Sequence, residues 1–475
     1  MTTETDFSAR LEDNTEELKK LLAADVNFDI LYKDMQIGER NAGFFFIDGF
    51  IKDEVMQKLM SALEGVKKEQ MPDTIEEFSK CHISYVEVDI ETEREALLRA
   101  LLSGVVCLFI DGYDKALAID CRTYPARGVD EPDKDRVMRG SRDGFVETIV
   151  FNTALIRRRI RSPKLRMEML SVGMSSKTDV VISYMDDRVD KKLLDNLRNR
   201  IESIKIDALT MNQESLAECL YKRSWINPFP KYKYSERPDT AAASILEGNI
   251  IVLVDNSPSV MILPTSVFDI IEEADDYYFP PVTGTYLRLS RFVTTILTLI
   301  LTPTWLLFMK NPAWIPSWLE FITPAEDIKV PLIFQLLILE FAIDGLRLAA
   351  VNTPNMLSTP LSVIAGLVLG DYAVQSGWFN SESMLYMAFV VLANYSQPSF
   401  ELGFALKFMR LIMLILTAAF SVYGYIAGAA IAVCAVVFNK TLSGKSYLYP
   451  VIPFNKKDFL RRFIRISLPK SEKQE

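Results

Sequence analysis

Histidine and cysteine are scarce in this 475-residue chain, and their pattern excludes several kinds of functional site. The single histidine, His82, cannot build a histidine-rich metal centre, and we interpret it as a structural residue. The five cysteines lack the CxxC spacing of a zinc site and are typical of a reducing compartment. The first part of the chain also shows no Ser/His/Asp arrangement and no paired carboxylates. We therefore expect neither an enzyme nor a bound metal or cofactor.

The first 286 residues have no excess of positive charge, because they contain 37 Lys and Arg against 51 Asp and Glu, a net charge of −14. Nucleic-acid binding needs clustered positive charge, so we expect no nucleic-acid partner. The rest of the chain contains 16 Lys and Arg against 11 Asp and Glu, a net charge of +5; the two nets add to −9. The first residues, MTTETDFSAR, lack the apolar core of a secretory signal. An acidic, water-soluble part is thus joined to an apolar, slightly basic part.

Strands and helices alternate in the acidic part, a pattern that predicts two small α/β subdomains. We expect an acidic lead-in at 1–35, the first subdomain at 36–125, and a linker with the second subdomain at 126–285. The first subdomain has predicted strands at 42–50 and 81–90, helices at 53–65 and 92–103, and a hairpin at 105–122. The second has a predicted helix from about 144 to 161 with Ser141 or Asp143 as N-cap, a strand at 180–184, a helix at 189–204 and a hairpin at 250–263.

Arginines crowd the linker and the end of its helix, at Arg139, Arg142, Arg157, Arg158 and Arg159. Basic residues at the C-terminal end of a helix compensate the helix dipole, so a solvated charged surface is one interpretation. The other is an interface for an acidic neighbour, either the acidic domain of another copy or anionic lipid headgroups. Both interpretations stay open at this stage.

Long apolar runs begin near residue 289 and are typical of membrane-spanning helices. Five segments qualify, at 289–309, 331–351, 361–375, 384–395 and 406–438. The third and fourth are short, whereas the last has 33 residues, enough for one long tilted helix or two short ones. We therefore predict an α-helical, multi-span membrane domain at 286–440, followed by a basic tail at 441–475.

Basic residues flank the spans unevenly. Arg288 and Arg291 precede the first span and the C-terminal tail is basic, whereas the loop at 311–327 has no Lys or Arg. The positive-inside rule then places both termini in the cytoplasm, which requires an even number of crossings. Five segments give an even number only if 406–438 divides in two or a short segment is re-entrant.

Three ionisable residues in the second span, Glu340, Asp344 and Arg347, are spaced so that one helix face carries them all. Such groups are costly in a membrane helix unless they face protein or water. Asp344 and Arg347 can pair, which leaves Glu340 the less compensated. This intramembrane charge network is either a clamp between neighbouring helices or the polar lining of an ion path.

The third span is a candidate pore lining. Ser362, Gly366 and Gly370 repeat every four residues, and Asp371 follows. Small residues at this spacing allow close helix packing. Repeated around an oligomer, they would instead ring a narrow path, with Asp371 at one mouth favouring cations. Packing and pore lining both remain possible interpretations.

Two long stretches resemble the GerA family of spore germination proteins. One is 122–187, which begins RTYPARGVDEPDKDRVMRGSRDGF, and the other is 334–378, FQLLILEFAIDGLRLAAVNTPNMLSTPLSVIAGLVLGDYAVQSGW. The resemblance covers most of the chain after about residue 36. Matches of this length in both parts of the chain are far more specific than a short motif.

The resemblance implies a cytoplasmic two-part N-terminal domain and a membrane domain in the spore inner membrane. It also implies a homo-oligomer that forms, or is a component of, an ion channel releasing monovalent cations during germination, alongside other spore germination membrane proteins. The segment that matches the family's pore helix is about 362–372. Two alternatives are the A subunit of a nutrient germinant receptor, acting with B and C subunits, and a non-conducting membrane scaffold for germination proteins.

Overall fold

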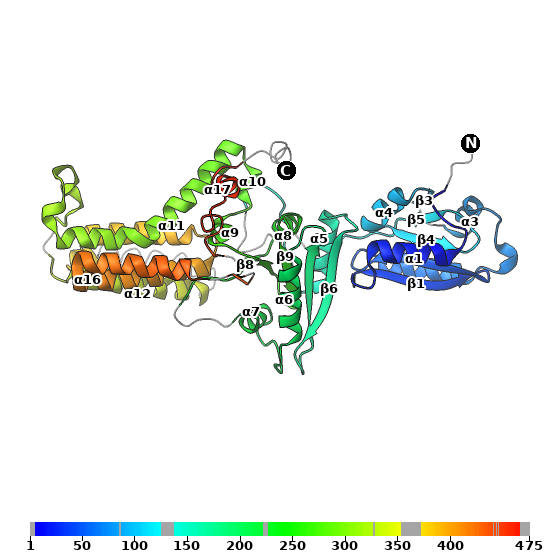
Figure 1. Ribbon diagram of the computed structural model, residues 1–475, viewed down its shortest axis with the longest axis horizontal. Coiled ribbons are helices and arrows are strands. Elements are labelled where there is room, and N and C mark those ends of the chain that lie inside the picture. Colours follow the sequence, from blue (N-terminus) through cyan, green and yellow to red (C-terminus); the bar gives the residue numbers. More distant parts are fainter. Residues whose placement is uncertain are drawn as a thin grey trace. The chain divides into compact units, whose positions relative to one another are not determined.

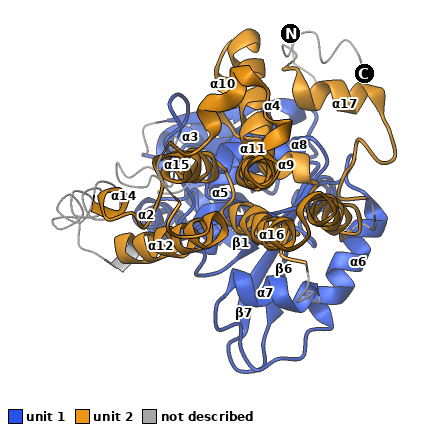
Figure 2. Cartoon of the chain, turned by 90° about the vertical axis from the view of Figure 1, so that its left-hand side faces the viewer, with its two compact units in different colours: residues 1–222, 232–264 blue, residues 223–231, 265–475 orange. Residues whose placement is uncertain are grey.

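The computed structural model describes residues 5–84, 87–124, 137–221, 227–325, 328–352, 372–439, 441–442, 444 and 446–465. The chain divides into two compact units, coloured separately in Figure 2. An α/β unit contains residues 1–222 and 232–264, and a helical unit contains residues 223–231 and 265–475. Figure 1 labels the elements of both units along the chain.

The first sheet of the α/β unit has five antiparallel strands in the order β1-β2-β4-β5-β3. Its strands are β1 (Ile30–Ile37), β2 (Arg40–Ile47), β3 (Val88–Glu91), β4 (Val106–Ile110) and β5 (Ala116–Ile119). Its helices are α1 (Leu11–Leu22), α2 (Asp53–Glu64), α3 (Ile75–His82) and α4 (Arg94–Leu102). A short 3₁₀ turn, η1 (Lys68–Gln70), precedes α3.

Helices cover both faces of this sheet, which explains the unbroken apolar run in β2. Phe44 belongs to a core with residues of α2 and α3, whereas Phe45 belongs to a core with residues of α1 and α4. Both rings are fully buried. Neighbouring residues of a strand point to opposite faces, so a strand covered on both sides needs apolar side chains at every position.

The second sheet repeats the topology of the first. Its order is β6-β7-β9-β10-β8, again antiparallel throughout. Its strands are β6 (Leu165–Val172), β7 (Thr178–Met185), β8 (Lys233–Ser235), β9 (Ile250–Val254) and β10 (Val260–Leu263). Its helices are α5 (Ile149–Arg159), α6 (Lys191–Glu202), α7 (Gln213–Leu220) and α8 (Pro238–Leu246). Both halves therefore run helix, hairpin, two helices, strand, helix, hairpin, and the α/β unit is a structural repeat.

Two predicted elements of the α/β unit were misplaced. The alternating residues 81–90 were expected to form one strand, but α3 extends to His82 and β3 begins at Val88. Helix α3 begins at Ile75 because Thr74 Oγ1 caps it by accepting a hydrogen bond from Glu77 N. Its residues Ile75 and Phe78 are part of the core.

The helix expected from about residue 144 begins instead at Ile149. Its first amide, Ile149 N, donates to Asp255 Oδ1 at 3.2 Å, and this acceptor is distant in the sequence. The expected cap Asp143 is committed to Arg159, and Phe145 N donates to Glu236 O at 2.8 Å. Tertiary contacts therefore decide where α5 begins.

The helical unit contains two helices that, among those described, are long and apolar enough to cross a bilayer: α11 (Pro281–Lys310) and α16 (Phe400–Val437). The other α-helices are α9 (Val267–Ile271), α10 (Asp275–Tyr278), α12 (Leu332–Asn352), α14 (Ala373–Gln375), α15 (Ser381–Tyr395) and α17 (Lys456–Phe463). Two 3₁₀ segments, η2 (Pro312–Trp314) and η3 (Ser317–Ile322), follow α11.

Helix α16 reverses direction at Ser421, whose φ of 51° and ψ of −124° are not helical. A Cβ added to Gly424 would lie 1.8 Å from Leu416 O, and one added to Gly428 would lie 2.8 Å from Met413 Cα. In a straight helix, eight residues span about 12 Å, so these contacts require the chain to fold back. The run at 406–438 is therefore an antiparallel helical hairpin, the second of the two forms that the sequence allowed.

The end of α11 caps this hairpin turn. Lys310 Nζ donates to the carbonyl oxygens of Thr417 and Ala418, one turn before the reversal. Asn311 Nδ2 donates to Ser421 Oγ at 3.0 Å. The Lys310 cation thus satisfies carbonyls that have lost their helical partners, and the Asn311 amide holds the side chain of the turn residue.

Candidate functional site

The acidic residues of α12 meet two basic residues of α16 inside the helical unit. Glu340 is 4% exposed, and its Oε1 accepts a hydrogen bond of 2.6 Å from Arg410 Nε. Asp344, one turn further along α12, forms an ion pair with Lys407. Lys407 Nζ also lies 3.8 Å from Glu340 Oε2 and donates to the carbonyl of Glu340 at 3.3 Å. Two acids and two bases thus form one network, which we call the four-charge network.

The four-charge network joins three helices. Arg410 Nη1 donates to Thr298 O of α11 at 2.8 Å, while its Nε contacts Glu340 of α12. Thr298 donates its own hydroxyl to Thr294 O, which is typical of a polar residue in an apolar helix. Because Arg410 lies on α16, a single guanidinium connects α11, α12 and α16.

The structure corrects the expected pairing within α12. The ion pairs of the described residues include none between Asp344 and Arg347, and Glu340 is fully compensated by Arg410 and Lys407. The Arg347 guanidinium lies 5.0 Å from the ring centroids of both Tyr395 and Phe404. The sequence does contain a sign of these basic partners, because Lys407 and Arg410 are three residues apart near the start of the last apolar run.

The charges of the four-charge network balance, and this determines what it can do. The carboxyl groups of Glu340 and Asp344 face the basic groups of Lys407 and Arg410, so the formal charges of the network sum to zero. Buried ions pay a large desolvation cost, and removing one partner leaves another charge unpaired. The arrangement can therefore hold three helices in register, and it can also respond to an ion or proton that competes for one of its groups.

A second ionic cluster surrounds the first turns of α11. Arg288 Nη2 lies 2.6 Å from Glu272 Oε1, and its Nε lies 3.3 Å from Asp276 Oδ2. Arg291 Nη1 contacts the other oxygen of Asp276 at 2.5 Å. Arg462 of α17 adds a 2.7 Å contact to Glu272 Oε2. Burial raises the pKa of Asp276, against the opposing effect of Arg291 and Arg288.

The predicted pore-lining residues Ser362, Gly366, Gly370 and Asp371 lie outside the described residues. A buried polar network holds the helices on either side of that segment together. Gln335 Oε1 of α12 accepts from Asn380 N at 2.9 Å and from Ser383 Oγ at 2.7 Å. Gln335 Nε2 donates to Asn380 Oδ1 at 2.7 Å, so the amide uses both of its ends.

The candidate interface arginines fall into two groups. Arg157 is fully buried and binds Asp29 with two parallel hydrogen bonds, Nε to Oδ2 at 2.8 Å and Nη2 to Oδ1 at 3.0 Å. Arg159 pairs with Asp143 at 2.6 Å, and the Arg158 guanidinium lies 4.4 Å from the centroid of the Tyr124 ring. Three of the five therefore have contacts within the α/β unit, whereas Arg139 and Arg142 are exposed.

The Arg157–Asp29 pair fastens the two sheets of the α/β unit to each other, because Asp29 precedes β1 and Arg157 lies on α5. Its neighbours take part as well. Asn27 Oδ1 accepts from Met167 N at 2.7 Å, and Phe28 N donates to Met167 O at 3.2 Å. The segment 27–29 thus joins the edge strand of the second sheet.

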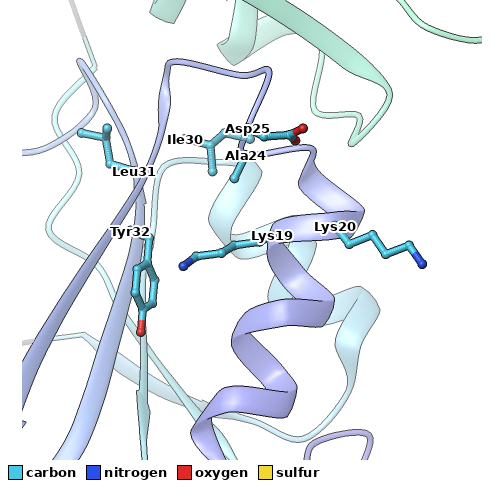
Figure 3. Close-up of a pocket in the computed structure, with 7 residues that line it drawn as sticks. All are labelled: Lys19, Lys20, Ala24, Asp25, Ile30, Leu31 and Tyr32. Carbon is cyan, nitrogen blue, oxygen red and sulfur yellow. The ribbon is translucent and has the colours of Figure 1, made fainter.

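A surface pocket of about 710 Å³ lies between the end of α1 and the start of β1. Its lining residues are Lys19, Lys20, Ala24, Asp25, Ile30, Leu31 and Tyr32 (Figure 3). Lys19 Nζ lies 3.9 Å from the centroid of the Tyr32 ring, while Lys20 points away from it. Among the described residues, no group of three or more His, Cys, Asp or Glu side chains is arranged to hold a metal ion.

Comparison with known proteins agrees with the resemblance seen in the sequence. The family described as Bacillus/Clostridium GerA spore germination protein matches residues 16–475. Stage V sporulation protein AF of Bacillus subtilis is 35% identical over 457 residues, 96% of this chain and 92% of that protein. Spore germination protein A1 of the same organism is 26% identical over 474 residues, 99% of this chain and 97% of that protein.

A solved structure also matches: the crystal structure of the N-terminal domain of the A subunit of the Bacillus megaterium spore germinant receptor GerK3. It is 26% identical, with a TM-score of 0.43, over 55% of this chain and 97% of that one. The family match covers nearly the whole chain, through both the α/β unit and the helical unit. The chain therefore belongs to the GerA family of spore germination proteins.

Proposed function

We propose that this protein is a multi-pass protein of the spore inner membrane that oligomerises and forms, or is a component of, an ion channel releasing monovalent cations during germination. The α/β unit and both termini lie in the cytoplasm. The protein acts without enzymatic chemistry. Its partners are further copies of the chain, other germination membrane proteins and the lipid bilayer.

The observation that carries this proposal is the four-charge network. Glu340, Asp344, Lys407 and Arg410 lie on helices whose other faces expose large apolar side chains, such as Phe341 and Phe408. A soluble protein would not expose this much apolar surface, whereas a bilayer would cover it. Ionisable groups on such helices mark an ion or substrate path more often than they do in soluble proteins.

The reversal at Ser421 supports the proposed orientation. It converts the five apolar segments of the sequence into six, because 406–438 contributes two antiparallel arms. Six segments give the even number of crossings that two cytoplasmic termini require. We place the conducting path at 361–375, where Ser362, Gly366 and Gly370 would line it and Asp371 would attract cations at one mouth.

Two other functions fit some of the same observations. Relatives named spore germination protein A1 and B1 favour a receptor subunit, whose loss would abolish the response to one germinant only. A charge-balanced network that holds three helices together would also suit a non-conducting scaffold. An ion-release protein differs from both, because its loss would slow germination with many germinants.

Potassium efflux from liposomes tests the proposal. We expect purified full-length protein to make liposomes leak K⁺, and we expect Gly366→Leu to reduce the leak at least tenfold, because the side chain would narrow the path. The matched control is Gly345→Leu on α12, where an added Cβ meets no atom within 4 Å. Asp371→Asn should lower the preference for K⁺ over Cl⁻.

The oligomeric state is measured on the same preparations, so that loss of flux is separated from loss of assembly. Intact oligomers that conduct nothing would contradict the channel proposal and favour the scaffold. A leak that Gly366→Leu and Gly345→Leu leave equally unchanged would contradict the placement of the path at 361–375.

A further inference from the structure

The short helix α17 has two distinct faces, and one of them is already occupied. Phe463 packs against Phe292 of α11 with ring centroids 4.7 Å apart, and against Phe268 of α9 at 5.9 Å. Phe459 continues this aromatic row at 4.7 Å from Phe463. Arg462, on the same side, contacts Asp269 and Glu272. These contacts fix the inner face of α17 to the rest of the helical unit.

The opposite face of α17 points to the outside and combines positive charge with an apolar side chain. Lys456, Lys457 and Leu460 are exposed, and Arg461 is half-buried. At 100° per residue these four positions fall within one 140° arc of the helix, which begins at Lys456 beside Phe463 and extends away from Phe459. We call this arc the outer face of α17. The helix carries four basic residues and one acidic residue, a net charge of +3.

Apolar side chains border the outer face at both ends. Ile452 precedes the helix and Ile464 follows it, at 46% and 48% exposed, whereas Phe454, 66% exposed, packs its ring against Phe459 with centroids 5.6 Å apart. A basic helix with exposed aliphatic and aromatic neighbours is typical of a segment that lies in the interface of a membrane.

Contacts with α11 determine where α17 lies relative to a bilayer. Arg465 N donates to Thr285 Oγ1 at 3.1 Å, and Arg288 Nη1 donates to the carbonyl of Arg461 at 2.8 Å. The end of α17 therefore lies beside the first two turns of α11. Exposed apolar side chains of α11 already occur within these turns, at Val282 and Tyr286, and the long apolar run of the helix begins directly after them, at Leu289. In a bilayer spanned by α11, this level is the headgroup layer.

We propose that the outer face of α17 binds anionic phospholipid headgroups of the bilayer that α11 spans. Lys456, Lys457 and Arg461 contact the phosphates, and Leu460 and its apolar neighbours insert between the headgroups. Positive charge next to a membrane span meets a negatively charged surface, and each such residue adds to binding. The acidic α/β unit of another copy would satisfy the charges but not the exposed apolar side chains. The lipid site holds whether or not the protein conducts ions.

Thermal unfolding of the full-length protein in mixed micelles tests this site. The mole fraction of phosphatidylglycerol is raised in a zwitterionic detergent, and the half-maximal rise in unfolding temperature is recorded. We expect Lys456→Gln with Lys457→Gln to need a roughly tenfold higher mole fraction than the wild type. The matched control is Lys67→Gln with Lys68→Gln, an adjacent exposed pair in the α/β unit, which should respond like the wild type.

Two further measurements separate a lipid surface from a site for free phosphate. Leu460→Asp keeps both lysines but places a negative charge among the headgroups, so it should also weaken the response to phosphatidylglycerol. Inorganic phosphate and glycerol phosphate should produce none of the wild-type rise. Equal responses of the wild type and the double-lysine variant would overturn the proposal, as would a full rise with phosphate alone or an unchanged response of Leu460→Asp.

Discussion

Both units of the molecule bury arginine against acid, but they distribute the partners differently. In the α/β unit, Arg157 and Asp29 have side chains that are 0% and 2% exposed, and they bind each other through two parallel hydrogen bonds. In the helical unit, Glu340 contacts both Arg410 and Lys407, and Lys407 also contacts Asp344. The Arg157–Asp29 pair is thus closed on itself, whereas the four-charge network shares its charges among four residues.

The difference matters because the cost of losing a partner depends on what remains. A lone carboxylate left in a dry core has no alternative donor, and the full desolvation cost remains. A carboxylate in a shared network keeps a second cation within reach. The structure therefore predicts a rigid joint between the two sheets and a more adaptable joint between α11, α12 and α16. A channel that changes state would need the second kind of joint.

The largest effect is expected from Arg157→Met. This change leaves Asp29 buried without its guanidinium and should lower the local free energy of unfolding by about 3–5 kcal/mol. Hydrogen exchange in the full-length protein measures the loss, because the amide of Met167 on β6 is held by Asn27 beside the pair. Protection at Met167 should fall, while protection in α12 and α16 should stay unchanged.

Two controls test whether the loss of protection comes from the unpaired carboxylate of Asp29. The double variant Asp29→Leu with Arg157→Met removes both charges and should recover most of the lost protection. Arg158→Met removes a neighbouring exposed arginine that lies over Tyr124 and should cost about 1 kcal/mol or less. If Arg158→Met costs as much as Arg157→Met, then charge on α5, and not the buried pair, holds the sheets together.

A smaller effect is expected from Arg410→Met in the four-charge network. Glu340 keeps Lys407 at 3.8 Å, so we expect a loss of about 2 kcal/mol in the protection of α12 amides. Lys407→Met should cost less still, about 1 kcal/mol, because Glu340 keeps Arg410 and Asp344 is one-third exposed. The expected loss of stability therefore decreases from Arg157→Met to Arg410→Met to Lys407→Met, because the charges of the last two are shared. A larger loss for Arg410→Met than for Arg157→Met would contradict this order.

The sequence predicted the acidic half of the four-charge network but not its basic half. Glu340, Asp344 and Arg347 share one helix face by their spacing alone, so their common direction follows from local geometry. Lys407 and Arg410 lie more than 60 residues later, and spacing within one helix says nothing about which other helix it packs against. The pairing of Asp344 with Lys407 is a tertiary contact, which periodicity does not contain.

Local patterns were informative in the α/β unit up to the point where long-range contacts intervened. The helix expected at 53–65 matches α2, because Met56, Leu59 and Leu63 mark its buried face. The start of α5 and the start of the strand expected at 81–90 were misplaced, since Asp255 supplies the acceptor for α5 and the helix α3 takes up residues 81 and 82. The repeat of the two sheets went unnoticed, because strand order depends on pairing between segments that lie far apart in the chain.

The smallest loss of stability is expected at a third kind of ion pair, Asp143 with Arg159, whose side chains are partly exposed. Burial alone would raise the pKa of Asp143, but hydrogen bonds from Arg159 and Ser141 outweigh it and hold the pKa below its usual range. A lowered carboxyl pKa stabilises the folded state above the unfolded pKa, near 4, and this contribution is lost as the pH falls through the folded pKa. Asp143→Asn should therefore cost about 1 kcal/mol or less at pH 7 and progressively less as the pH falls below about 4. Urea unfolding of the full-length wild type and variant across this range measures the difference, and a constant difference between them would show that the charge of Asp143 contributes nothing.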